Sequence, residues 1–356
     1  MRIALHGPLE GKQGSSMNSA SVSPRRATIR TVAQAAGVST ATVSYVLSGR
    51  SGRTDAPGVS TETELRVREA ALGLGYRPNQ AARTIRTGKS NLMMLSLTML
   101  SDPWSLSVSK AVGAAVAPAG ITPMILADTD WRTAIKRQGA DVVFIDAADE
   151  EGDAQLLAEL ARSNRLVVFS ETLEPNGFDV VRSLAGTSMD QAMDHLTAVH
   201  TKVACLTSAN SLRSLNSVRY GAYVRGLERA GLELRENYVA TFDGDEISAY
   251  EAAVTLLRQP DPPTAIFATS DFVAIAAVHA AQRLRLDVPG DLAVVGIGNT
   301  LQGEAMAPSL TSVGPSGFFD RLADFLVRRA KDQSGPPQVL EFPWQLLVRD
   351  TAPAAP

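Results

Sequence analysis

Residues 28–49 read TIRTVAQAAGVSTATVSYVLSG, and this order of residues predicts two short helices joined by a tight turn. Apolar residues at helical spacing mark the first helix, namely Ile29, Val32 and Ala36. Gly37 follows at a position where a left-handed backbone can end a helix at little energetic cost. Val38 then supplies an apolar plug before the second helix begins.

A second helix is predicted over about residues 40–47, because Ser39 is a good N-cap. Its buried stripe is predicted to consist of Val43, Val46 and Leu47. Its opposite side carries small and polar residues that can enter the major groove of DNA: Thr40, Ala41, Ser44 and Tyr45. The stretch predicts a helix-turn-helix unit, and a small αα-hairpin inside a larger core is the alternative.

The next forty residues predict a third helix and a short fourth one. Ser60 and Thr61 mark the start of the third helix, and Glu64 is predicted to complete a capping box with Thr61. Its buried face is predicted to comprise Val67, Ala71 and Leu74. The run YRPNQAARTIR at 76–86 then predicts a short helix of small residues with one projecting side chain, Ile85.

Three segments together resemble the DNA-binding headpiece and hinge of the LacI/GalR family of transcriptional regulators: AQAAGVSTATVS at 33–44, VLSG at 46–49 and LGYRPNQAAR at 74–83. The resemblance implies a repressor that binds a pseudo-palindromic DNA operator as a homodimer. The residues expected to contact DNA are Thr28, Arg30, Ser39, Thr40, Ala41, Thr42, Ser44, Tyr45, Asn79, Ala82, Arg83, Ile85 and Arg86.

The hinge, residues 79–86, is too short to persist as an isolated helix, since helices below ~12 residues are marginal in water. We therefore expect it to be disordered in the free protein and to fold on DNA. There, Ala81 and Ala82 would let two hinges pack closely, and Ile85 would enter the minor groove between base pairs. The alternative is a fixed linker in which Ile85 packs on the rest of the chain.

Charge is divided unevenly along the chain. Residues 1–90 contain 13 Lys and Arg against 5 Asp and Glu, a net charge of +8, whereas residues 91–356 contain 21 against 32, a net of −11. A basic headpiece is attracted to phosphates, while an acidic body is kept off the DNA. The asymmetry agrees with the helix-turn-helix motif.

The composition, 45% hydrophobic and 20% charged, is typical of a globular chain. No apolar run reaches the length of a membrane span, and the first ten residues lack the features of a signal peptide. The single cysteine, Cys205, lies in an apolar context and is predicted to fill the core. We expect a cytoplasmic protein with a disordered tail over residues 1–27.

From residue 92, short apolar runs alternate with helical segments. Strands are predicted near 92–98, 121–126, 141–146, 165–169, 201–207, 237–242, 264–268 and 292–296, and helices near 105–117, 152–162, 187–197, 217–230, 246–258 and 271–284. This alternation predicts two Rossmann-like α/β subdomains with parallel sheets. The runs RYGAYVRGL at 219–227 and VPGDLAVVG at 288–296 extend the family resemblance, which implies a periplasmic-binding-protein-like effector domain.

The predicted domains are therefore an all-α headpiece at 28–77, a hinge and linker at 78–90, and an effector-binding and dimerisation domain at 91–350. Its first subdomain is expected over about 91–182 and 314–332, and its second over about 183–313 and 333–350. In the fold implied by the resemblance, the chain crosses between subdomains three times. A helix near 316–331 should return to the first subdomain, and a last strand near 339–344 to the second.

No catalytic constellation stands out. The run GIGNTLQG at 296–303 lacks the third glycine of a dinucleotide-binding fingerprint, which would fall at Leu301. The four histidines have no metal-ligand spacing with Cys205 or with one another, and Ser170 and Ser270 lack the glycines of a nucleophile elbow. We expect neither an enzyme nor a cofactor or metal. A solute-binding protein or enzyme of the same architecture is the alternative to a regulator.

The resemblance implies an effector site between the subdomains, with contacts from Trp104, Arg219, Ser270, Asp271 and Asn299. Trp104 would stack on a ligand or, alternatively, anchor the cleft as a buried aromatic. The match is incomplete, because Gly298 and Asn299 replace the family's Asp-Asp pair, and the segment at 128–135 is shortened at the expense of a helix. We expect either a sugar-like but less polyhydroxylated effector or weak binding. Part of the dimer interface is expected on the helix near 271–283, at Ala274, Val278 and Ala281.

Overall fold

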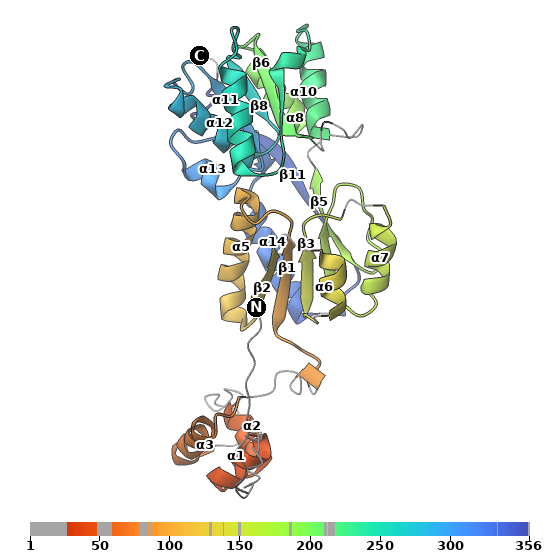
Figure 1. Ribbon diagram of the computed structural model, residues 1–356. Coiled ribbons are helices and arrows are strands. Elements are labelled where there is room, and N and C mark those ends of the chain that lie inside the picture. Colours follow the sequence, from red (N-terminus) through yellow and green to blue (C-terminus); the bar gives the residue numbers. More distant parts are fainter. Residues whose placement is uncertain are drawn as a thin grey trace, which may run out of the picture. The chain divides into compact units, whose positions relative to one another are not determined.

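Figure 1 shows the computed structural model, which describes residues 27–47, 59–77, 84–85, 87–127, 130–137, 139–148, 151–184, 187–209, 212, 218–332 and 334–354. The chain divides into two compact units, Met1–Gly88 and Lys89–Pro356. The expected tail at 1–27 lies outside the described residues except for Ala27. Among the described residues, no helix is long and apolar enough to cross a membrane.

The headpiece consists of α1 (Ile29–Ala36), α2 (Thr40–Leu47) and α3 (Thr61–Gly73). These helices pack around a small core of Val32, Ala33, Ala36, Val43, Val46, Val67 and Ala71. Thus the helix-turn-helix predicted from the sequence is confirmed, and the α2 residues Val43 and Val46 are buried as expected. Leu74, which was expected on the buried face, is instead exposed just after α3 ends.

The cap of α3 also differs from the prediction. The Ser60 hydroxyl accepts a hydrogen bond from the Thr63 backbone N–H at 3.3 Å, so Ser60 is the N-cap. Glu64 does not close a capping box with Thr61, because its carboxylate accepts hydrogen bonds from Arg68 one turn later, at 2.6 and 3.0 Å. An ion pair at this helical spacing competes with the reach back to the helix start.

The second unit contains two α/β lobes. The first lobe has the parallel strands β1 (Leu92–Leu97), β2 (Thr122–Ala127), β3 (Val142–Ile145), β4 (Leu166–Phe169) and β5 (Asp179–Leu184), in the order β2-β1-β3-β4-β5. Its helices are α5 (Pro103–Val116), η1 (Ala117–Ala119), α6 (Trp131–Arg137), α7 (Asp153–Leu160) and α14 (Phe318–Lys331). In Figure 1, α5 and α14 lie on one side of the sheet, and α6 and α7 on the other.

The second lobe has β6 (Val203–Ser208), β7 (Val239–Phe242), β8 (Ala265–Ala268), β9 (Ala293–Ile297) and β10 (Thr311–Pro315), in the order β10-β9-β8-β6-β7. Its helices are α8 (Ser188–Thr197), α10 (Val218–Arg229), η2 (Glu236–Tyr238), α11 (Glu246–Leu257), α12 (Asp271–Arg283) and α13 (Leu301–Ala305). Central strands such as β8 are buried throughout, as their continuous apolar sequence requires in a sheet covered on both faces.

The last strand, β11 (Val339–Leu347), belongs to both lobes. Its first half pairs in parallel with β5, from Val339 opposite Val180 to Pro343 opposite Leu184. Its second half pairs antiparallel with β10, where Trp344 lies opposite Pro315. The prediction that this strand lies wholly in the second subdomain is therefore wrong.

The chain crosses between the lobes at three places: after β5, after β10 and within β11. After the second crossing α14 returns to the first lobe, where Phe318, Leu322 and Leu326 join the core beneath α5. This return was expected from the family resemblance.

Two further expectations fail. The segment near 128–135 does contain a helix, α6, whose first turn is supported by Asp130, since its carboxylate accepts a hydrogen bond from the Arg132 N–H at 3.0 Å. On α12, Ala274, Val278 and Ala281 have no exposed surface, because α11 and the sheet cover them. These three residues cannot form a dimer interface in this fold.

Candidate functional site

Two caps fix the turn of the helix-turn-helix. Gly37 ends α1 in the left-handed conformation, with φ of 65°. The Ser39 hydroxyl accepts a hydrogen bond from the Thr42 backbone N–H at 3.1 Å, which satisfies a donor in the first turn of α2. At the other end of the unit, Thr28 and Thr31 form a reciprocal capping box at the start of α1. The angle between α1 and α2 is thus set by local hydrogen bonds.

The outer side of α2 combines exposed and half-buried residues. Thr40 and Ala41 are exposed, as are Thr28 and Arg30 at the start of α1. Ser44 and Tyr45 are half-buried, and the Tyr45 ring packs against the headpiece core. This side therefore offers small polar groups and one aromatic side chain to a DNA groove.

At the hinge, the structure describes Thr84, Ile85 and Thr87 as helical. The Gly88 N–H donates a hydrogen bond to the Thr84 oxygen at 2.8 Å, which closes one helical turn. Ile85 is 87% exposed. The other hinge residues expected to contact DNA, namely Asn79, Ala82, Arg83 and Arg86, lie outside the described residues.

The second unit encloses a cavity of about 220 Å³ that is lined by both lobes. Its walls come from the carboxyl ends of parallel strands, where ligands bind in α/β folds: Thr98 follows β1, Asp146 follows β3, Phe169 ends β4, Ser270 follows β8 and Gly298 follows β9. Trp104, Arg219 and Ser270, which were expected to contact an effector, all line this cavity.

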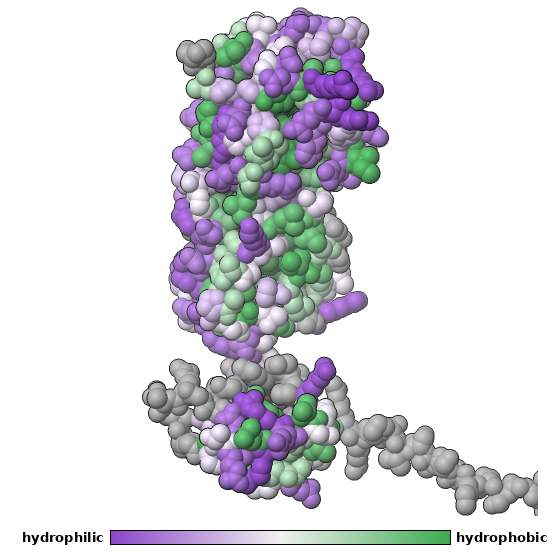
Figure 2. All heavy atoms as spheres, turned by 90° about the vertical axis from the view of Figure 1, so that its left-hand side faces the viewer, coloured by the Kyte–Doolittle hydropathy of each residue, from purple (hydrophilic) through white to green (hydrophobic). Residues whose placement is uncertain are grey.

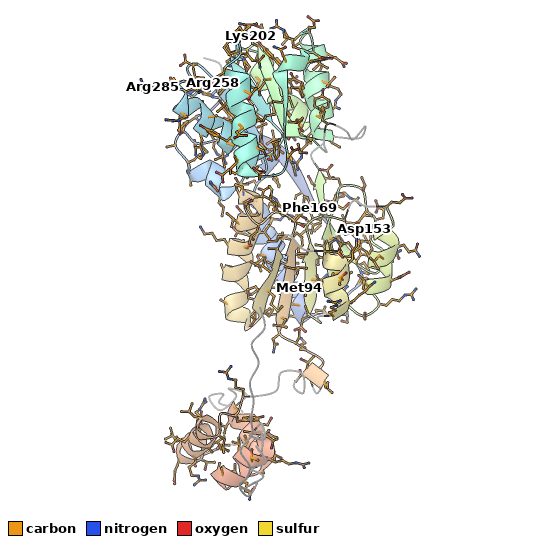
Figure 3. All side chains as sticks on the ribbon, in the orientation of Figure 1. Met94, Asp153, Phe169, Lys202, Arg258 and Arg285 are labelled. Carbon is orange, nitrogen blue, oxygen red and sulfur yellow. The ribbon has the colours of Figure 1, made fainter. Side chains whose placement is uncertain are left out.

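Aromatic rings form one wall of the cavity. The Trp104 ring centroid lies 5.3 Å from that of Phe169 and 5.8 Å from that of Phe318. Figure 3 shows Phe169 at the end of β4 that faces the second lobe. Trp344 of β11 completes the aromatic lining. Phe318 and Trp344 escaped the sequence analysis because they come from the second and third crossings, far from the other lining residues in the chain.

Arg219 brings a positive charge to the cavity from the first turn of α10. Its guanidinium donates one hydrogen bond, to the Thr269 backbone oxygen at 2.7 Å. Burial lowers the pKa of this guanidinium, and the carboxylates of Glu171, Asp102 and Asp271 act in the opposite direction. Among the described residues, no carboxylate forms an ion pair with Arg219.

Two carboxylates of the first lobe face the same cavity. Asp102 caps α5, and one of its oxygens accepts a hydrogen bond from the Trp104 N–H at 2.8 Å. Burial raises the pKa of Asp102; the Trp104 N–H and Arg219 lower it, and Asp271 and Asp146 raise it further. Asp146 accepts hydrogen bonds from the backbone N–H and the hydroxyl of Thr98, each at 2.7 Å.

Asp271 and Asn299 do not line the cavity. The Asp271 carboxylate is 1% exposed and accepts hydrogen bonds from the Ser312 hydroxyl at 2.6 Å and the Thr300 N–H at 2.7 Å. Asn299 donates to the Pro315 oxygen at 3.3 Å and accepts from Arg349 at 2.6 Å. Both side chains therefore support the turn that carries Gly298.

No group of three or more His, Cys, Asp or Glu side chains in the described ranges is placed to hold a metal ion. Cys205 is fully buried, and burial raises the pKa of its thiol far above the ordinary value. A thiol in this state is a core side chain rather than a nucleophile.

Each of the two units matches a known protein family. Residues 28–79 match the family described as bacterial regulatory proteins, lacI family, and residues 193–352 match the periplasmic binding protein-like domain. The first match covers the helix-turn-helix and α3, and the second covers the second lobe with α14 and β11.

The DNA-binding unit belongs to the lacI family of bacterial regulatory proteins.

Relatives cover most of this chain. It is 28% identical over 336 residues to the HTH-type transcriptional repressor PurR of Photobacterium profundum, covering 91% of this chain and 98% of the relative. A solved complex of the transcriptional regulator CelR with cellobiose has a TM-score of 0.58 and 26% identity, covering 92% of this chain and 100% of that chain. A solved lac repressor dimer bound to operator and the anti-inducer ONPF has a TM-score of 0.68 and 22% identity, covering 93% and 100%, and shows the shared fold.

Proposed function

We propose that this lacI-family regulator represses transcription by binding a pseudo-palindromic operator as a homodimer, and that a small molecule in the interlobe cavity controls its affinity for DNA. The observation that carries the proposal is the combination, in one chain, of a capped helix-turn-helix and a cavity lined by both lobes. The similarity to a transcriptional repressor over nearly the full length supports it. A DNA partner also implies a cytoplasmic protein.

The proposed DNA contacts are the exposed residues Thr28, Arg30, Thr40 and Ala41, the half-buried Tyr45, and the hinge residue Ile85. One headpiece offers a single short helix to the groove, so one copy can read only a half-site. Two copies related by twofold symmetry would read both halves. The net charge of +8 over residues 1–90 adds a sequence-independent attraction to phosphates.

The proposed coupling uses the two-lobed architecture. A ligand that contacts both lobes stabilises one arrangement of the lobes over others, and only such differential binding can shift a conformational equilibrium. The first lobe contains Lys89, which continues directly from the hinge. A change in the spacing of two first lobes in a dimer would therefore favour or oppose hinge folding on DNA.

The experiment is selection of bound fragments from random DNA by the purified full-length chain, repeated with and without a panel of metabolites. We expect enrichment of one pseudo-palindromic sequence and a change in its affinity with at least one metabolite. Tight metabolite binding without any sequence enrichment would contradict the proposal and favour a solute-binding protein.

A further inference from the structure

We propose that the interlobe cavity accepts a zwitterion, a molecule with a cationic nitrogen and an anionic oxygen group on an apolar body, such as a free α-amino acid with an apolar side chain. The inference rests on the proposed function, because it names the chemical class of the effector that would occupy this cavity. It derives from two opposite charges that line the cavity from different lobes and are not paired with each other.

The anionic group of the ligand would bind Arg219. A guanidinium has five N–H donors, and Arg219 uses one hydrogen bond, to the Thr269 oxygen. The remaining donors belong to a half-buried cation that lines the cavity beside Ser270 and Trp344. A carboxylate accepts two parallel hydrogen bonds from such a fork, which makes it the best-matched partner.

The cationic nitrogen would bind at Asp102. One oxygen of this carboxylate accepts the Trp104 N–H, and no hydrogen bond from a described residue reaches the other. Arg219 favours the charge on Asp102 from across the cavity, whereas Asp271 and Asp146 disfavour it by repulsion. A cation placed there relieves the repulsion, whereas a purely anionic ligand would add to it.

The aromatic wall favours the same ligand. The rings of Trp104, Phe169 and Phe318 lie within 6 Å of one another by their centroids. Aromatic faces attract ammonium groups and bury apolar side chains. The faces of these rings form no hydrogen bonds with a ligand that is rich in hydroxyl groups.

The remaining polar groups of the cavity are poorly suited to a polyol. Asp146 is occupied by the two donors of Thr98. The Ser270 hydroxyl caps α12 by accepting the Val273 N–H at 3.3 Å. Asp271 lies outside the cavity lining, where Ser312 and Thr300 hold its carboxylate. Sugar recognition needs several carboxylates or amides that are free to bind hydroxyl groups. Because these groups already form hydrogen bonds within the protein, the cavity favours a zwitterion over a sugar.

The test is isothermal titration calorimetry of the full-length chain with L-phenylalanine and L-leucine. The matched probes are 2-phenylethylamine, which lacks the carboxylate, and 3-phenylpropionate, which lacks the amine. Cellobiose and hypoxanthine represent the sugar and purine classes. We expect at least one amino acid to bind, and each one-charge analogue to bind about 10- to 100-fold more weakly, because each loses one charged hydrogen-bonding end.

Substitutions at Asp102 and Arg219 test where the cationic and anionic groups of the ligand bind. Asp102→Asn retains a capping side chain for α5 and should weaken amino-acid binding by about tenfold or more. It should strengthen binding of 3-phenylpropionate, because a carboxylate that repels this anion is removed. Arg219→Gln should weaken the amino acid similarly and leave the amine unchanged, and Arg219→Lys should restore part of the affinity. Asp324→Asn, which removes an exposed carboxylate of α14, is the matched control and should bind as the parent does.

Operator binding by the same samples separates this inference from the proposed function. If cellobiose or hypoxanthine releases the operator and the titrations with amino acids show no heat of binding, the proposal of a zwitterionic effector is wrong. The proposed function as a regulator would still hold. Absence of amino-acid binding at 10 mM, about the weak end of specific recognition, would overturn the inference as well. If the chain binds an amino acid but selects no operator sequence, the result would support the inference about the cavity and count against the proposed regulation of transcription.

Discussion

Tyr45 lies on the outer side of α2 and packs with part of its ring against the headpiece core. Tyr45 has no guanidinium fork of the kind with which arginine reads guanine. Its hydroxyl and ring can instead form a single hydrogen bond and contact a thymine methyl group.

We predict that Tyr45→Ala weakens operator binding by about 1–3 kcal/mol more than it weakens binding to random DNA. Fluorescence anisotropy with both DNAs at one salt concentration measures the difference. Tyr45→Phe keeps the packing and isolates the hydroxyl. An equal loss on both DNAs for Tyr45→Ala would show that the ring only supports the fold.

Asp102 gives a pH-dependent prediction. Since burial raises its pKa in the folded state, the ionised carboxylate destabilises the fold, and this cost appears as pH rises above the unfolded value near 3.8. On acidification from pH 7 the folded state takes up the proton first, so the parent should gain stability relative to Asp102→Asn. We predict that the Asn variant melts higher at pH 7 and that its advantage shrinks toward pH 4. A melting-temperature difference that is constant with pH would contradict this assignment.

Some of the residues that line the cavity could be predicted from the sequence. Trp104, Arg219 and Ser270, which were expected at the cavity from the family resemblance, do line it. Asp271 was misplaced, since its position at the start of α12 does not show that Ser312, on a strand still to come, binds its carboxylate. Thr98 and Asp146 were missed, although their places directly after β1 and β3 were a usable signal. Which of these residues touch an effector stays a prediction.

All eight strands that the sequence predicted are present, whereas β5, β10 and α13 were not predicted. The strands β1, β3, β6, β8 and β9 lie within two residues of their expected bounds, because buried parallel strands have unbroken apolar sequences. The sequence DVVRSL of β5 is interrupted by Arg182, and α13 has only five residues, too few to show helical periodicity. Both were missed for those reasons.

The short helical turn that closes at Gly88 carries the third prediction. Ile85 is 87% exposed, which leaves it available to a partner. We predict that Ile85→Gly abolishes specific operator binding and the bending of the DNA, because an inserted apolar side chain offsets the cost of unstacking base pairs. Band-shift assays with circularly permuted operators measure both properties.

Ile85→Leu is the control, since it retains an apolar side chain of equal size and should retain the bend. The melting temperature of the effector domain should be unchanged in both variants. Operator affinity and bending that survive Ile85→Gly would end the proposal that this residue enters the minor groove.

At the scale of the whole molecule, dimerisation needs a surface other than α12. The edge strand β2 exposes Met124 and Ile125, and α5, which packs beside it, exposes Leu106. Figure 2, which faces the left-hand side of Figure 1, shows hydrophobic residues gathered on the first lobe. An edge strand with exposed apolar side chains is a ready surface for a second copy of the chain.

We predict a concentration-dependent monomer–dimer equilibrium in analytical ultracentrifugation, shifted toward monomer by Ile125→Asp. Ile247→Asp on α11 introduces the same charge at a side chain that is 72% exposed in the second lobe, and should leave the equilibrium unchanged. A monomer at all concentrations that still binds operator with full affinity would refute the dimer.

The strand β11 has a thermodynamic consequence. Because its two halves complete two different sheets, neither lobe retains all its strands when the other melts. The lobes should therefore lose structure as one cooperative unit, although each has its own hydrophobic cores. Differential scanning calorimetry should show one endotherm for residues 89–356, with equal calorimetric and van't Hoff enthalpies, and two resolved endotherms would mean that the shared strand does not couple them. A destabilising substitution in either lobe would then lower the thermal resistance of both.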